Sequence, residues 1–107
     1  MKIEIGSIII DYNGNPVVDE NGPLTIRKLL RMYAGMYVPD RNPKAAEESV
    51  IANAVALKIH NAETEVDLTE EEYSILNKSI STPRHGSLVF SQIYASVTNP
   101  VEKVGGE

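Results

Sequence analysis

Three signals for the start of a helix divide most of the chain. Thr25 precedes an apolar run at helical spacing, and Asn42 is followed by Pro43, whose ring already holds a helical φ. Thr69 and Glu72 have the spacing of a capping box, in which each side chain accepts a hydrogen bond from the other residue's backbone N–H. These signals predict helices at about residues 26–36, 43–61 and 70–80.

A fourth apolar segment follows Pro83 and the loop that this proline begins. Its apolar residues recur mainly at helical spacing, which predicts a fourth helix at about residues 87–97, with a strand as the alternative. Residues 99–107 follow this segment, and we expect them to form a C-terminal tail.

The sequence before the first helix is typical of β-structure. Residues 2–10 are rich in isoleucine, and the pair Asn13-Gly14 follows soon after. Asn-Gly between apolar runs favours a type I′ hairpin turn, because both central residues of that turn need a positive φ. We therefore expect a β-hairpin over residues 2–18, with residues 17–18 as its return strand.

These elements together predict a single α+β domain over residues 1–98, an N-terminal β-hairpin followed by three to four α-helices in a small bundle. A chain of 107 residues suits one hydrophobic core and leaves no room for two. Hydrophobic residues make up 42% of the chain, with one Phe and no Trp, so the core must be aliphatic. Association with another chain would add to the stability of such a modest core.

Several kinds of site are excluded by composition. The chain has no cysteine, which removes disulfides, thiol catalysis and zinc-thiolate sites. His60 and His85 do not have the spacing of a zinc motif, and the sequence contains no glycine-rich phosphate loop and no nucleophile elbow. We therefore expect a protein that is not an enzyme and has no metal or cofactor.

The hydrophobic runs are too short for membrane insertion. None approaches the ~20 residues of a membrane span, and the first residues lack the pattern of a signal peptide. The expectation is a soluble, cytoplasmic protein with no membrane partner.

Charges are segregated along the chain, whose net charge is −5. Half of the basic residues lie within residues 27–44, and six acidic residues lie within residues 63–72. The net charge disfavours nucleic-acid binding, as does the lack of aromatic residues among the basic ones. Such a dipolar chain suits a homo-oligomer or a charged protein partner, although two solvated helix faces would give the same pattern.

The acidic segment before the third helix has two interpretations. Oxygen-bearing side chains stand at positions 1, 3, 5 and 12 of a possible calcium loop, namely Asn61, Glu63, Glu65 and Glu72. Position 6 of that loop requires a glycine and is Val66 here, and the capping box already uses Glu72. We therefore favour the helix start, in which acids in the first turn also complement the helix dipole.

The basic side of the first helix is the candidate binding site. Arg27, Lys28 and Arg31 lie opposite its apolar residues, and Arg84 and His85 could join them if the loop before the fourth helix folds back. Such a cluster suits an anionic small molecule such as a nucleotide. The alternative is that these residues form only the solvated face of an amphipathic helix.

Three stretches of the chain, GNPVVDENGPLTIRKLL, ALKIHNAETEVDLTEEEYSILNKSI and SLVFSQIYASV, resemble small, mostly uncharacterised proteins encoded by tailed phages and prophages. The resemblance spans most of the chain outside residues 33–43, and it rests on spacing and apolar pattern. It implies a short hairpin, a helix that starts at Leu-Thr, an acidic connection and a closing helix that contains Gln. It further implies a protein of the host cell cytoplasm that takes part in particle assembly or blocks a host factor, and it assigns no functional residue.

Overall fold

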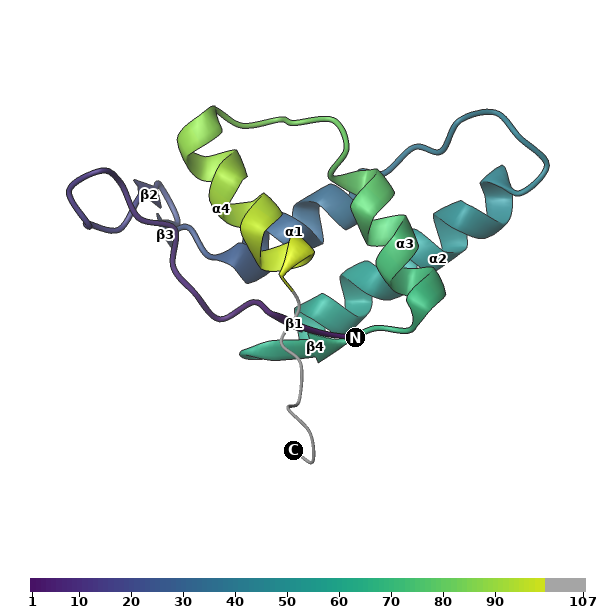
Figure 1. The fold of residues 1–107 in the computed structure, drawn as a ribbon, viewed down its shortest axis with the longest axis horizontal. Helices are drawn as coiled ribbons and strands as arrows, with labels where there is room; N and C mark the ends of the chain where they lie inside the picture. The colour runs from purple at the N-terminus through teal and green to yellow at the C-terminus, as the bar shows by residue number, and fades with distance from the viewer. Residues whose placement is uncertain (100–107) are drawn as a thin grey trace.

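The computed structural model describes residues 1–99, which form four helices and two small antiparallel sheets (Figure 1). The helices are α1 (Ile26–Gly35), α2 (Ala45–Asn61), α3 (Glu70–Ser79) and α4 (Ser87–Thr98). The strands are β1 (Lys2–Glu4), β2 (Val18–Asp19), β3 (Gly22–Pro23) and β4 (Glu65–Asp67). The predicted α+β class is confirmed, and the fourth segment is a helix and not a strand.

Local capping sets the starts of α1 and α3. Thr25 Oγ1 accepts a hydrogen bond from Lys28 N at 3.1 Å. Thr69 Oγ1 accepts from Glu72 N at 3.2 Å, and Glu72 Oε1 accepts from Thr69 N at 2.9 Å, so the predicted capping box is present. Each bond satisfies a backbone N–H that the first turn of a helix would otherwise leave unpaired.

Helix α2 begins two residues later than predicted. Asn42 and Pro43 belong to a turn in which Asn42 Oδ1 accepts from Lys44 N at 2.7 Å and Asn42 O accepts from Ala45 N at 3.1 Å. Lys44 is the N-cap residue, and it makes no side-chain capping bond. The Asn-Pro pair therefore turns the chain ahead of the helix, because the Asn42 side chain satisfies an N–H only two residues on.

Residues 2–18 contain a hairpin turn but do not form one continuous hairpin. At the turn Asp11 N donates to Asn15 O at 2.8 Å, and Asp11 Oδ1 accepts from the backbone N–H groups of Asn13 and Asn15. Gly14 has a φ of 81°, but no non-glycine residue among residues 1–99 has a positive φ. The expected type I′ turn is therefore wrong, because it needs a positive φ at Asn13 too, and the Asp11 side chain stabilises a different loop.

Strand β1 pairs with β4, about sixty residues further along the chain, and not with the residues after the turn. The register places Ile3 opposite Val66, and both side chains are buried in the core. Figure 1 shows the two strands side by side near the bottom of the view. The sequence predicts a helix start in the acidic segment, and the alternation of exposed Glu65, buried Val66 and exposed Asp67 also forms a strand there.

The core lies between the β1–β4 sheet and the four helices. Helix α1 is central, since it packs against α2, α3 and α4, and α4 also contacts β1. The core is aliphatic, as the composition predicts, and Tyr33 is its one fully buried aromatic side chain among the described residues. Its largest members include Ile3, Ile5, Ile9, Leu30, Ile59, Leu68, Leu76, Ile80 and Ile93.

Helix α2 contacts both α1 and α3 but buries only one stripe of residues. That stripe consists of Ala52, Val55, Ala56 and Ile59. Val50 and Leu57 are 70% and 54% exposed, so the other side of this helix meets solvent.

Two further findings concern the membrane and the C-terminus. Within residues 1–99 no helix has both the length and the apolar character needed to cross a membrane. Of the predicted tail, residues 99–107, only Asn99 is described. It follows α4, and its backbone N–H donates to Ala95 O at 3.0 Å. The other residues of that tail lie outside the described residues.

Candidate functional site

A groove beside α1 brings together three of the five candidate residues. We call it the α1 groove; its lining residues are Asp19, Leu24, Lys28, Leu29, Arg31, Met32 and His85. Its volume is about 560 Å³, within the roughly 300–1,000 Å³ of small-molecule sites. Arg27 and Arg84 do not line it.

The groove has an apolar floor and a charged rim. Leu24, Leu29 and Met32 supply the apolar surface, while Lys28 approaches Asp19 of β2, with Nζ 3.3 Å from Oδ2. The hydrogen bond from the backbone of Asn21, and then the nearby Lys28 ammonium, lower the pKa of Asp19. The charge of Lys28 is therefore already compensated within the fold.

Arg31 is the cation of the groove that lacks a carboxylate partner among the described residues. Its Nη1 lies 2.8 Å from His60 Nδ1, and because a guanidinium can only donate, that nitrogen accepts. No described ion pair involves Arg31. Its charge is thus available to an anion held over the apolar floor.

Arg27 has a structural role that the sequence does not indicate. Its Nε donates to Ile59 O at 3.2 Å, and its Nη2 donates to His60 O. The guanidinium therefore caps the last carbonyls of α2 and ties α2 to α1, where a cation also complements the helix dipole. Arg27 does not line the α1 groove, so we exclude it from the candidate binding site.

The loop before α4 does fold back, and Tyr33 holds it there. The buried Tyr33 hydroxyl accepts from Arg84 N at 2.8 Å and lies 3.0 Å from His85 Nδ1. His85 is thereby positioned at the groove, whereas the Arg84 side chain makes no hydrogen bond or ion pair among residues 1–99. No local pattern in the sequence links Tyr33 to a loop about fifty residues away.

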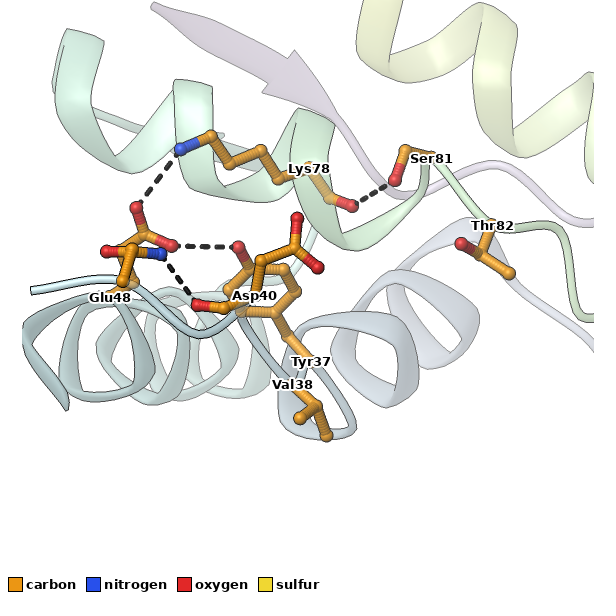
Figure 2. Close-up of a pocket in the computed structure, with 8 residues that line it drawn as sticks. Tyr37, Val38, Asp40, Glu48, Lys78, Ser81 and Thr82 are labelled. Atoms are coloured by element: carbon orange, nitrogen blue, oxygen red, sulfur yellow. Dashed lines mark hydrogen bonds and ion pairs between the residues drawn. The ribbon is translucent and has the colours of Figure 1, made fainter. Parts of the chain in front are cut away.

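A second, polar pocket lies between the α1–α2 connection and α3 (Figure 2) and has a volume of about 260 Å³. Glu48 bonds to two other residues of the pocket: Oε1 accepts from the Tyr37 hydroxyl at 3.0 Å, and Oε2 accepts from Lys78 Nζ at 3.1 Å. The bonds from Lys78 and Tyr37 lower the pKa of Glu48, while burial and the Glu48 carboxylate raise the pKa of Tyr37. These hydrogen bonds connect Glu48 of α2 to Lys78 of α3 and to Tyr37, which follows α1. The polar groups of the cluster therefore pair with one another.

A third feature is an apolar surface on the N-terminal segment. We call it the N-terminal apolar surface; its members Ile8, Ile10, Tyr12 and Val18 are 44%, 46%, 87% and 63% exposed. Gln92 of α4 holds this segment, since its Oε1 accepts from Ile10 N at 3.0 Å and its Nε2 donates to Ile10 O at 2.7 Å. The hairpin turn of this segment projects from the body at the left of Figure 1.

Two acidic residues of the acidic segment, Glu65 and Glu72, belong to its secondary structure. Glu72 Oε1 accepts from Lys58 Nζ at 2.7 Å as well as from Thr69 N, and Glu65 lies in β4. Within the part of the chain that the structure describes, no group of three or more His, Asp or Glu side chains could hold a metal ion.

Comparison of the chain with protein-family models, with curated proteins and with solved structures finds no match. The resemblance to small phage proteins therefore stays a prediction.

Proposed function

We propose that the chain is a non-enzymatic interaction protein that self-associates and binds a protein partner. The observation that carries this proposal is the N-terminal apolar surface, where large apolar side chains are grouped on one segment and remain exposed. Apolar side chains grouped in this way mark association sites more often than isolated ones do. If the resemblance to phage proteins holds, the partner is a component of the particle or a host factor.

A second copy of the chain suits this surface. Ile8 and Ile10 flank the buried Ile9 and so point to the same side of an extended segment. The Gln92 side chain already bonds to the backbone N–H and C=O of Ile10. A second chain would therefore contact the side chains of Ile8 and Ile10, which carry no charge. Two identical apolar surfaces related by a two-fold axis would bury each other.

Sedimentation velocity tests the self-association. We expect the wild-type chain to sediment as a dimer or larger species at both low and high salt. The double variant Ile8→Ser/Ile10→Ser should sediment as a monomer, because it removes two of the four large apolar side chains of this surface. The matched control is Val50→Ser, an exposed apolar residue on α2, which should leave the assembly unchanged. A wild-type chain that stays monomeric at high concentration would refute self-association.

A second candidate function is the binding of an anionic small molecule, such as a nucleotide, in the α1 groove. The observation that favours it is the Arg31 guanidinium, which has no carboxylate partner among the described residues and stands beside an apolar floor. A ligand at 100 times its dissociation constant adds about 2.7 kcal/mol to the free energy of unfolding.

Thermal unfolding against a panel of nucleotides tests this second function. A stabilising nucleotide should lose its effect on Arg31→Gln and keep it on Arg84→Gln, whose side chain lies outside the groove. No shift with any nucleotide would retire the idea.

A further inference from the structure

Strand β4 has a free edge. The residues that flank it, Thr64 and Leu68, make backbone hydrogen bonds on the β1 side: Thr64 O accepts from Ile5 N and Leu68 N donates to Met1 O, at 2.8 Å each. Hydrogen-bonded positions alternate along an antiparallel ladder, so the N–H and C=O groups of Glu65 and Asp67 point away from β1. No backbone hydrogen bond links these four groups to another residue among residues 1–99.

A shallow groove runs along this edge. We call it the β4 groove; it has a volume of about 390 Å³ and is lined by Leu57, Lys58, Asn61, Ala62, Glu65, Val66 and Asp67. No residue of β1 lines it, which places it on the side of β4 that faces away from β1. Leu57 of α2 contributes a large apolar side chain that is mostly exposed. The groove therefore combines unpaired backbone groups with an apolar contact.

Negative charge surrounds the free edge. Glu63 and Glu65 are exposed and form no ion pair among the described residues. Glu65 also lies directly opposite Glu4 of β1, and like charges in that position destabilise a strand pair. A cation bound at this edge would relieve the repulsion.

The cations near the groove do not cancel this charge. Lys58 pairs with Glu72, at 2.7 Å between Nζ and Oε1, so its charge is already compensated. The Met1 ammonium lies 3.2 Å from Asp67 Oδ1, and Lys2 lies opposite Asp67 in the strand register. Glu4, Glu63 and Glu65 form no ion pair among the described residues, so an excess of negative charge remains along β4.

We propose that the β4 groove binds an extended, basic segment of a protein partner, which adds to the free edge of β4 as a further strand. The backbone of the segment would bond to Glu65 and Asp67, its Lys or Arg side chains would pair with the exposed carboxylates, and an apolar side chain would contact Leu57. A second copy of β4 does not fit, because it would set the same acids against one another. The inference deepens the partner-binding part of the proposed function and does not depend on self-association.

Binding of a fluorescently labelled hexapeptide of alternating lysine and valine tests the proposal, with the full chain titrated and fluorescence anisotropy as the readout. Alternation puts the lysines on one face of the strand and the valines on the other. We expect binding that weakens as salt is added and no binding of the corresponding glutamate–valine peptide.

Variants of the chain separate this site from a general attraction between opposite charges. Glu63→Lys/Glu65→Lys should weaken peptide binding about tenfold or more, as expected for reversed charges at a contact. The matched control, Glu20→Lys/Glu47→Lys, changes the net charge equally at exposed acids outside the groove and should bind nearly as the wild type does. Equal loss in both double variants would overturn the proposal.

Peptide backbone methylation tests the strand addition itself. Only alternate N–H groups of the peptide can face β4, so methylation of either the lysine or the valine nitrogens should abolish binding while the other pattern is tolerated. Parent-like binding of both methylated peptides, or no binding of the parent, would overturn the proposal. The variant Ile8→Ser/Ile10→Ser should bind the peptide as the wild type does, which separates this result from that of sedimentation.

Discussion

The capping box at the start of α3 offers the sharpest test of how the acidic segment is used. Thr69→Ala removes the acceptor of the Glu72 N–H, and Glu72→Ala removes the acceptor of both the Thr69 N–H and the Lys58 ammonium. The two variants therefore delete one interaction and two interactions, respectively, at the same helix end.

The structure sets the expected magnitudes. Loss of a threonine N-cap costs about 1 kcal/mol of the free energy of unfolding. The Glu72 side chain is 13% exposed, so its ion pair with Lys58 is screened less than a fully exposed pair. We expect Glu72→Ala to cost about 1.5–2 kcal/mol, the sum of the cap bond and a favourable ion pair. A loss of 1 kcal/mol lowers the melting temperature of a domain of about this size by roughly 4–8 °C.

Urea unfolding followed by circular dichroism measures both losses. Thr69→Ser keeps the hydroxyl and should stay close to the wild type. Thr82→Ala, at an exposed threonine in the loop before α4, controls for the loss of a threonine side chain as such. A double-mutant cycle with Lys58→Met isolates the ion pair from the cap bond.

Two results would contradict this role of the acidic segment. Wild-type stability in Thr69→Ala would mean that the capping box does not stabilise α3. A melting temperature that rises with added calcium, and no longer rises in Glu72→Ala, would mean that the acidic segment binds an ion after all.

Three further predictions concern the described contacts. Arg27→Met should lower the free energy of unfolding by about 1 kcal/mol or more, because the last carbonyls of α2 lose their donors, whereas Arg84→Met should not, and urea unfolding measures both. Gln92→Ala leaves the N–H and C=O of Ile10 unpaired, so amide hydrogen exchange of the N-terminal segment should accelerate while that of α2 does not. The hydrogen bonds from Lys58 and from the Thr69 backbone, outweighing partial burial, lower the pKa of Glu72. The Glu72 carboxylate therefore makes its full contribution to the free energy of unfolding above about pH 4.5, and this contribution is lost as the pH falls through the folded-state pKa. In Glu72→Gln the free energy of unfolding should fall less steeply with acid than in the wild type.

Where a helix would start was predictable because the signals are local. Thr25 and the Thr69–Glu72 pair bond to backbone groups within three residues of themselves, so the neighbouring sequence is enough to predict these bonds. The start of α2 predicted from Asn42 is wrong because the Asn42 side chain can satisfy a nearby N–H either in a helix cap or in a turn. The Asn-Gly pair likewise marks the turn correctly, while Asp11 decides its type.

The candidate site was only partly predictable. Helical spacing correctly put Lys28 and Arg31 on one side of α1, and the idea that the loop before α4 folds back placed His85 near them. Helical spacing cannot show that Arg27 bonds to the end of α2, and this contact excludes Arg27 from the site. It also cannot show Tyr33 holding the loop or Gln92 holding Ile10, because both bonds join residues that are distant in the chain.

The α+β class, the aliphatic core and the approximate positions of the helices follow from the sequence alone, since composition and capping act through neighbouring residues. The tertiary fold is needed to show that β1 pairs with β4, that α2 leaves Val50 and Leu57 exposed, and which charges remain available at the surface. Strand pairing and side-chain exposure depend on what packs opposite, and for this chain the partner of β1 lies about sixty residues away along the sequence.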